Sequence, residues 1–349
     1  MAAFSSKFNH ACKFEGWRHQ SIKPSPLRHC TVRAVTDVGS GLRLKHLGGQ
    51  EELQLLFSEC YSESCCYLGG DFISLRPGNT VVDVGANIGL FSLFASKKVE
   101  STGCVIGVEP FPEAAQAARE NVESHLMWCS ENEQNFKACK PLIINAAAGD
   151  SSLPSVELTA YSRAVGWSTL VPDDEEVLQN MRSYLEGLLS QPQDSGNSSS
   201  STGTQGPASS SLQSMPDSVM IKLGRTLRGT ALLRPISRLL EEVVVRTMLA
   251  SKRLVNVPQV TLSGVIQEHG LERIDLLKVD VERAELQVLG GIMDQDWPRI
   301  RQVSLEVHNV DKRVEHLCKV LRSRGFSSTM AQQDARMAGT NLWMVYAKR

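Results

Sequence analysis

Acidic side chains stand at or just after the ends of four short apolar runs in this 349-residue chain. The side chains concerned are Asp83, Glu109, Asp280 with Glu282, and Glu306 with His308. Carboxylates can hold hydroxyl or ammonium groups of a ligand, and a carboxylate or an imidazole can remove a proton from a reacting group. If the runs are parallel strands, their carboxyl ends meet at one edge of a sheet, and the four groups predict one shared site.

The stretch from Val81 to Phe91 predicts a strand, a tight turn and the start of a helix. Gly85, Asn87 and Gly89 occupy the turn, where backbone N–H groups and the helix dipole favour an anion. A turn that binds a pyrophosphate has the spacing G-x-G-x-x-G, and Asn87 stands where that pattern needs glycine. The turn therefore favours an amino-acid carboxylate over the pyrophosphate of a dinucleotide.

Glu109 lies 24 residues after Gly85, where a carboxylate can accept hydrogen bonds from both hydroxyls of a ribose. A ribose and an amino-acid carboxylate occur together in S-adenosylmethionine, so we predict this cofactor. Its ammonium group would meet Asp83, and its adenine amine would meet Asp150, for which a turn-capping role is the alternative. The predicted cofactor-binding residues are Asp83, Gly85, Asn87, Gly89, Glu109 and Asp150.

Transfer of a methyl group to a hydroxyl needs an aligned nucleophile and a group that removes its proton. His308 or Glu282 is the predicted base, because both stand at strand ends and an imidazole titrates near neutral pH. Glu306 and Asp280 would orient the acceptor, or Asp280 would anchor the following helix start. The same four side chains could offer oxygen and nitrogen ligands to a magnesium ion, but their spacing does not require one, and no metal is predicted.

These residues are positioned by an alternation of strands and helices. The predicted strands cover 80–84, 105–109, 142–148, 274–281, 303–308 and 342–346, and predicted helices follow at 90–98, 113–124, 175–189, 284–292 and 314–324. A hairpin is predicted at 155–161. Strand–helix–strand repeats of this length indicate right-handed crossovers, so the predicted fold class is α/β, a doubly wound, mostly parallel sheet.

Two segments depart from this pattern. Residues 1–36 are basic and poor in acids, which is typical of a loosely docked extension or an organelle transit peptide. Residues 190–253 form a predicted insertion, in which the Ser/Gly-rich part 191–215 is disordered and 221–253 is a basic amphipathic helix. Because βα units flank the insertion on both sides, residues 37–349 are interpreted as one interrupted domain.

The overall composition limits the classes of partner. A formal net charge of −1 gives no general reason to bind nucleic acid, and no apolar run is long enough to span a bilayer. Nine scattered cysteines without a C-x-x-C pair favour reduced thiols over a zinc cluster. The expected location is cytoplasmic, or a plastid or mitochondrion if the first 35 residues act as a transit peptide. The oligomeric state is left open.

Several motifs also resemble one protein family. Pro77–Phe91, Val105–Pro110 and Leu277–Glu282 strongly resemble segments of the FkbM-family methyltransferases, and Trp167–Leu170 and Leu305–His308 look like later landmarks of that family. The resemblance covers residues 37–189 and 255–348. It implies a class I Rossmann-like methyltransferase that uses S-adenosylmethionine, usually on a hydroxyl of a small molecule or sugar, with a final antiparallel strand at 342–346.

The resemblance has departures as well. Many members have glycine where Arg283 stands, and the insertion has no counterpart, so a small-molecule acceptor is expected without an identity. The segments 283–285 and 296–301 look closer to members associated with polyketide and peptide natural products. Two other functions remain open from the residues alone: an NAD-dependent oxidoreductase, and a non-catalytic methyltransferase-like binding module.

Overall fold

A computed structural model of the chain describes residues 33–38, 42–62, 65–150, 153–162, 164–190, 243, 245–334 and 337–349. Within these ranges, the side chains of 33–35, 51 and 184–190 are not described. The predicted disordered segment at 191–215 and most of the predicted N-terminal extension lie outside the described residues.

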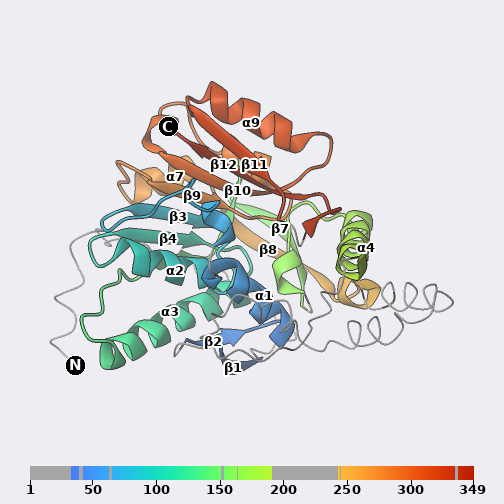
Figure 1. Cartoon of the computed structure of the whole chain (residues 1–349), viewed down its shortest axis with the longest axis horizontal. Coiled ribbons are helices and arrows are strands. Elements are labelled where there is room, and N and C mark those ends of the chain that lie inside the picture. Colours follow the sequence, from blue (N-terminus) through green and yellow to red (C-terminus); the bar gives the residue numbers. More distant parts are fainter. Residues whose placement is uncertain are drawn as a thin grey trace, which may run out of the picture.

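The centre of the fold is a seven-stranded sheet with the order β11-β12-β10-β9-β3-β4-β5 (Figure 1). Its strands are β3 Thr80–Val84, β4 Cys104–Val108, β5 Leu142–Ile144, β9 Leu276–Val279, β10 Gln302–His308, β11 Ser328–Gln332 and β12 Leu342–Lys348. The neighbours β5, β4, β3, β9 and β10 are parallel, whereas β12 runs antiparallel between β10 and β11. The α/β class, the doubly wound sheet and the antiparallel C-terminal strand are therefore confirmed.

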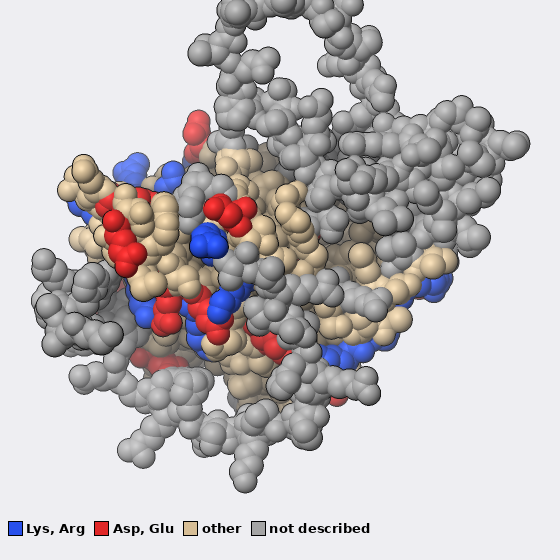
Figure 2. Space-filling model, turned by 90° about the horizontal axis from the view of Figure 1, so that it is seen from below, with Lys and Arg blue, Asp and Glu red and all other residues tan. Residues whose placement is uncertain are grey.

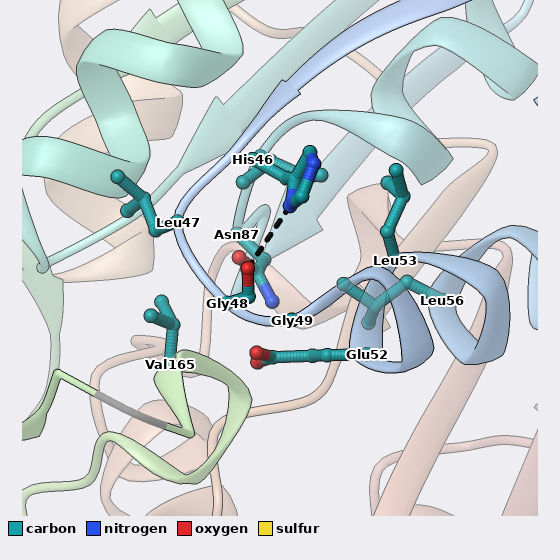
Figure 3. A pocket seen from close by; sticks show the side chains of 10 residues that line it. His46, Leu47, Gly48, Gly49, Glu52, Leu53, Leu56, Asn87 and Val165 are labelled. Atoms are coloured by element: carbon teal, nitrogen blue, oxygen red, sulfur yellow. Dashed lines mark hydrogen bonds between the residues drawn. The ribbon is translucent and has the colours of Figure 1, made fainter. Parts of the chain in front are cut away.

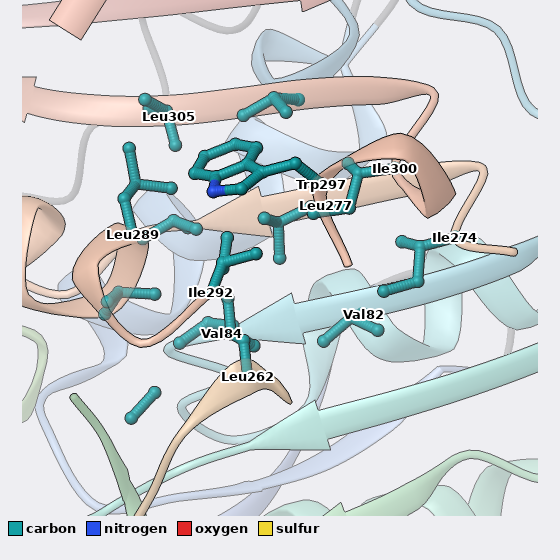
Figure 4. Packing of buried hydrophobic residues seen from close by; sticks show 14 of the residues in the cluster. Val82, Val84, Leu262, Ile274, Leu277, Leu289, Ile292, Trp297, Ile300 and Leu305 are labelled. Atoms are coloured by element: carbon teal, nitrogen blue, oxygen red, sulfur yellow. The ribbon is translucent and has the colours of Figure 1, made fainter. Parts of the chain in front are cut away.

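Strand alternation divides the core into two faces of this sheet. Val82, Val84 and Leu277 pack with buried residues of α7 Leu262–Glu268, α8 Glu285–Gly290 and α9 Arg313–Ser323. Figure 4 shows Trp297 lying among the strand and helix side chains of this cluster. Val81 and Leu276 pack on the opposite face, where Asp83 also points because it lies two residues after Val81.

Three helices of the first half cover that opposite face. They are α1 Gln50–Tyr61, α2 Leu90–Val99 and α3 Pro112–Asn132, and Figure 1 shows α2 and α3 together on one side of the sheet and α9 on the other. The short strands β1 Arg33–Asp37 and β2 Arg43–His46 pair with each other, and β2 packs beside α3. Strand β1 crosses the boundary that the sequence placed after residue 36.

A second, three-stranded sheet has the order β6-β8-β7. Its strands are β6 Ala147–Ala148, β7 Ser155–Tyr161 and β8 Lys252–Val260. The predicted third strand over 142–148 is thus divided, since β5 stays in the main sheet and β6 leaves it. The predicted local hairpin at 155–161 is wrong, because β7 pairs antiparallel with β8 on the far side of the insertion.

The end of the insertion also differs from the prediction. Residues 245–249 are helical, but Lys252 and Arg253 begin β8 instead of ending a basic helix, because they pair with Tyr161 and Ala160 of β7. The helix predicted before the insertion is present as α4 Asp174–Ser190. Strands from both sides of the insertion share the main sheet, so the two βα blocks form one continuous core.

Three further features bear on the expectations from composition: the cysteines, the hydrophobicity of the helices and the surface charge. Cys104, at the start of β4, is disulfide-bonded, so the expectation of reduced thiols is wrong at this position. No helix in the described ranges is long and apolar enough to cross a membrane. On the face shown in Figure 2, acidic and basic side chains of the described residues are interspersed, in keeping with a net charge near zero.

Candidate active site

The turn between β3 and α2 has the backbone that the sequence predicts. Gly85 and Gly89 adopt left-handed conformations with φ of 79° and 86°, and Asn87 does so with φ of 48°. A Cβ atom at Gly85 would overlap the carbonyl of Asp280, so only glycine lets β9 approach this closely. Asparagine tolerates the left-handed region better than most side chains, which explains how Asn87 replaces a glycine. The turn leads directly into the N-terminus of α2, which Gly89 caps.

Glu109 is fixed at the end of β4 beside this turn. Its carboxylate accepts hydrogen bonds from the backbone N–H groups of Asn87 at 2.7 Å and Phe111 at 2.8 Å. Burial raises the pKa of Glu109 to about 7, although the two backbone N–H groups oppose this shift. The structure therefore brings Glu109 and Asn87 together, as the sequence predicts, and holds the carboxylate rigidly.

Asp83 has a different environment from the one expected. It is fully buried, opposite Lys278 in the parallel pairing of β3 with β9. Its carboxylate accepts a hydrogen bond from Ser92 at 2.7 Å and lies 3.1 Å from the ammonium group of Lys278. The expectation that Asp83 meets the ammonium group of a ligand is therefore corrected, because a cation of the protein already neutralises it.

Lys278 is the principal site residue that the sequence reasoning missed. Its ammonium group donates to the Gly85 carbonyl at 2.9 Å, lies 3.4 Å from Asp280, and stands 4.8 Å from the centre of the Tyr67 ring. Burial alone would lower the pKa of Lys278, but Asp83 and Asp280 raise it above its usual range, so the charge is retained. A lysine inside an otherwise apolar strand was the signal that could have identified it.

Asp280 is held by two neighbours at the end of β9. Its carboxylate accepts a hydrogen bond from the hydroxyl of Tyr67 at 2.9 Å and is paired with Lys278. Lys278 links it in turn to the Gly85 turn. No pattern in the sequence singles out Tyr67, which comes from a short 3-10 helix, η1 Cys66–Leu68. This helix belongs to the N-terminal cover, by which we mean the described residues between 42 and 75.

His308 lies between two carboxylates at the end of β10. Its ring nitrogens donate to Glu176 at 2.8 Å and to Glu282 at 3.0 Å. Burial opposes protonation, but the two hydrogen bonds raise the pKa of His308 to about 10. The pKa of Glu176 is lowered to about 2 despite its burial, chiefly by the bonds from His308 and Asn341. His308 is therefore an imidazolium at neutral pH, which does not fit the predicted role of a base.

Glu282 and Glu306 complete this cluster. The side chain of Glu282 is 19% exposed, which makes it the more accessible partner of His308. Burial and then the neighbouring carboxylates, with Asp280 the largest contributor, raise the pKa of Glu306 well above its usual value. The four predicted catalytic residues are thus gathered at the carboxyl ends of β9 and β10.

The same cluster contains a possible set of metal ligands. One ligand atom from each of Glu282, Glu306 and His308 lies within 4.8 Å of the others. A histidine binds a metal through a nitrogen without a proton, whereas both nitrogens of His308 donate to carboxylates in this arrangement. Binding of a metal ion through His308 would therefore require the loss of one of these protons, so a metal ion and a proton would compete for this cluster.

Residues 164–171, called the crossing segment below, pass over these strand ends. The hydroxyl of Thr169 donates to the backbone carbonyl of Glu282, and the carbonyl of Val171 accepts from Arg283 at 2.9 Å. Arg283 is buried, with φ of 78°, in the conformation that favours glycine. The segment Trp167–Leu170, a landmark in the sequence, therefore serves to hold the residues that follow β9.

Asp150 is the predicted site residue that the structure does not bring into this group. It is exposed after β6, and the space beside it is filled by Gly290 of α8. Asn145, after β5, instead donates to the backbone carbonyls of Glu109 and Pro110. A role of Asp150 in binding adenine stays a prediction.

Comparisons with known proteins identify the family of this chain. The sequence model of the methyltransferase FkbM domain matches residues 83–328. The 31-O-demethyl-FK506 methyltransferase FkbM of Streptomyces tacrolimicus is 30% identical over 312 residues, which cover 89% of this chain and 95% of that protein. Methyltransferase sdnD of Sordaria araneosa is 25% identical over 298 residues, covering 85% of this chain and 90% of that protein.

Among solved structures, the methyltransferase FkbM of Methylobacillus flagellatus KT aligns with a TM-score of 0.41 at 10% identity. The alignment covers 84% of this chain and 48% of that one. The family match spans both βα blocks and the residues gathered at the strand ends. The chain is a methyltransferase and belongs to the FkbM-domain family.

Proposed function

We propose that the protein transfers a methyl group from S-adenosylmethionine to a hydroxyl group of a small-molecule acceptor. The observation that carries this proposal is the cluster of Glu282, His308 and Glu306 at the ends of β9 and β10. Lys278 and Asp280 connect that cluster to the turn at Gly85. A proton acceptor thus stands next to a turn suited to the anionic end of a cofactor.

The residues around the turn fit S-adenosylmethionine in two respects. The N-terminus of α2 after Gly89 offers backbone N–H groups and a positive dipole end to a carboxylate. Glu109, held by two backbone N–H groups, keeps lone pairs that can accept from ribose hydroxyls. When bound, this cofactor supplies a methyl group on a sulfonium that an oxygen nucleophile can displace. An adenine contact from Asp150 stays part of the proposal.

Glu282 is the proposed acceptor of the hydroxyl proton. His308 already carries its proton, and burial raises the pKa of Glu306 well above its usual value, which favours its protonated form. Glu282 is the remaining group of the cluster that can take a proton while partly exposed. The N–H of His308 orients the carboxylate of Glu282. In this proposal Glu306 donates a hydrogen bond to the acceptor.

The acceptor class rests on the relatives and on the charge of the chain. The name of the Streptomyces tacrolimicus relative specifies methylation of 31-O-demethyl-FK506, so a hydroxyl of a natural-product-like molecule is the first candidate here. A net charge of −1 gives no support for a nucleic-acid acceptor. An NAD-dependent oxidoreductase is not favoured, since the family match is to methyltransferases.

The proposal is tested first by thermal-shift and calorimetric titration with S-adenosylmethionine, S-adenosylhomocysteine and NAD. We expect the two adenosyl ligands to raise Tm by several degrees, because a ligand at about 100 times its Kd stabilises the folded state by about 2.7 kcal/mol. NAD should leave Tm unchanged. Binding of NAD alone would contradict the proposal, and binding of none of the three would favour a non-catalytic module.

A further inference from the structure

A small pocket lies beside the turn that starts α2, under the N-terminal cover (Figure 3). Its walls include Gly48 and Glu52 from the cover, Asn87 and Ile88 from the turn, and Val165 from the crossing segment. The pocket thus adjoins the helix start that we propose for an amino-acid carboxylate. Figure 3 shows the carboxylate of Glu52 reaching between Val165 and the loop at Gly48 and Gly49.

Glu52 is a mostly buried acid that has no cation beside it among the residues that the structure describes. Its carboxylate accepts a hydrogen bond from the N–H of Gly166 at 2.8 Å, and it forms no ion pair with any residue in the described part of the chain. Burial raises its pKa, and the backbone bonds only partly oppose this. A buried carboxylate is costly unless it is paired, so the pocket lacks one positive charge.

Two other buried acids of this protein show the usual arrangement. Asp83 has Lys278 at 3.1 Å, and Glu285 has Arg313 at 3.2 Å. The contrast is sharpest with Asp83, because it lies beneath the same turn and its charge is already balanced. Of the acids near the turn, Asp83 is paired with Lys278 and Glu109 is proposed for the ribose hydroxyls, so Glu52 is the one left for a positively charged ligand.

A second, independent atom in the pocket also lacks a partner. The side-chain oxygen of Asn87 is buried and accepts no hydrogen bond from the described residues. The side-chain nitrogen of the same amide and the carboxylate of Glu52 lie 3.9 Å and 3.4 Å from the position that a Cβ atom at Gly166 would take, so the two side chains line the same small space. The carboxylate of Glu52 and the amide oxygen of Asn87 are two hydrogen-bond acceptors from residues that line one pocket, which suits a ligand with several donors, and an ammonium group has three.

The backbone of the cover makes room for this carboxylate. A Cβ atom at Gly48 would overlap the outer oxygen of Glu52, so the side chain packs against bare backbone there. Glu52 comes from the first turn of α1, which is anchored by Leu53 in the core. The carboxylate is consequently held toward the turn by the fold of the cover.

We propose that Glu52 is a cofactor-binding residue that receives the α-ammonium group of the methionyl end of S-adenosylmethionine, together with the side-chain oxygen of Asn87. An α-amino acid carries its carboxylate and its ammonium on the same carbon. A carboxylate placed on the N-terminus of α2 therefore brings the ammonium beside the turn, where Glu52 and Asn87 lie. This assignment rests on the proposed function, and it replaces Asp83 in the role expected from the sequence.

The test compares two ligands in the full-length protein and in the variant Glu52→Gln. S-Adenosylhomocysteine carries the amino-acid end, whereas 5′-methylthioadenosine has the same adenosine and a thioether but no amino acid. We expect Glu52→Gln to raise the Kd of S-adenosylhomocysteine about 10- to 100-fold, which is the range for losing a charged hydrogen-bond partner. The Kd of 5′-methylthioadenosine should stay within about twofold.

The controls separate this role from a structural one. Glutamine keeps the acceptor for Gly166 and removes only a buried charge, so Tm of the ligand-free variant should not fall. Glu157→Gln, on an exposed position of β7, should change neither affinity. Glu52→Asp keeps the charge on a shorter side chain. It should raise the Kd of S-adenosylhomocysteine but not that of 5′-methylthioadenosine, which keeps the test available if the glutamine variant does not fold.

The outcomes are distinct. An unchanged Kd of S-adenosylhomocysteine in Glu52→Gln, or an equal loss for both ligands, would overturn the assignment of Glu52 and leave the proposed function standing. If the wild-type protein bound neither adenosyl ligand, the proposed function would fail, and the assignment with it.

Discussion

Single buried charges decide how this site is organised at the scale of residues. Lys278 contacts Asp83, Asp280 and the Gly85 carbonyl, so one side chain joins two strands and the turn. The register of β3 with β9 places Lys278 opposite Asp83, which leaves Asp83 paired inside the protein. A carboxylate that looks like a ligand-binding group in the sequence is thereby converted into a structural one.

Arg283 has an unfavourable backbone conformation and a buried, well-contacted side chain. Its φ of 78° lies in the left-handed region, which costs a residue other than glycine about 1–2 kcal/mol. Its buried side chain donates to Val171 and lies 3.7 Å from Glu176. The departure from the family's glycine is therefore accompanied by contacts that hold α4 and the crossing segment next to Glu282.

Glu282, the proposed base, should be needed for the rate of methyl transfer. With an acceptor that the wild-type protein methylates, tested first with 31-O-demethyl-FK506, Glu282→Gln should lower kcat by about 10²–10⁴-fold, because a general base contributes that much. The Kd of S-adenosylhomocysteine should be unchanged, since Glu282 acts on the acceptor. The measurement is the rate of S-adenosylhomocysteine formation under single-turnover conditions.

Glu268→Gln is the matched control, because Glu268 is exposed at the end of α7. It should retain the wild-type rate. A near-normal rate in Glu282→Gln would exclude Glu282 as the base and leave Glu306 as the next candidate.

At the scale of elements, the turn between β3 and α2 depends on close packing against β9. Gly85 has φ of 79°, and its α-carbon faces the carbonyl of Asp280 with no space for a side chain. Gly270, in the turn after α7, has a similar φ of 60° but nothing within 4 Å of the position of a Cβ atom. The two glycines thus share a backbone conformation and differ in their surroundings.

This difference predicts the outcome of two alanine substitutions. Gly270→Ala should cost about 1–2 kcal/mol, the strain of a left-handed alanine. Gly85→Ala should cost about 2–5 kcal/mol, because overpacking against backbone adds to that strain. Urea denaturation of both variants gives the comparison. Equal losses would mean that β9 yields at Asp280 and that the turn is less tightly packed than the structure shows.

The strand pairing of the small sheet was predicted wrongly from the sequence. Strand β7 alternates and is followed by turn residues, which also fits a local hairpin. Its actual partner, β8, begins at Lys252, more than ninety residues later. Local patterns carry no information about which distant strand completes a pair, so this pairing needed the tertiary structure.

For the whole molecule, the group of Glu176, His308 and Glu282 ties α4 to the strands β9 and β10 and makes stability depend on pH. The pKa of His308 is raised from 6.5 to about 10 in the folded state. A raised folded pKa contributes stability that is fully present below the unfolded value and is lost as pH rises through the folded value. This contribution therefore disappears between about pH 6.5 and pH 10.

The prediction follows from the sign of this shift. Tm of the wild-type protein should fall between pH 7 and pH 9.5, and His308→Asn should show a shallower fall because it has no proton to lose. The exposed His316→Asn on α9 is the control and should follow the wild type. Differential scanning calorimetry in buffers of equal ionic strength measures the slopes, and identical slopes for His308→Asn and wild type would contradict the assigned protonation.

The sequence by itself determined the fold class, the turn at Gly85–Gly89 and the ends of the strands that carry Glu109, Glu282, Glu306 and His308. These features depend on local patterns: apolar runs, glycines at a tight turn, and acids directly after strands. Parallel strands then bring their carboxyl ends to one edge of the sheet, which is why these side chains could be predicted to lie close together.

Only the tertiary structure decided which charges neutralise one another. Asp83 is paired with Lys278, His308 holds its proton between two acids, and Glu52 has no ion pair with a described residue. Each of these outcomes joins segments far apart in the chain, through strand register and the packing of the cover. Because charges interact through space and at short range, their partners follow from the fold and not from the spacing of residues along the sequence.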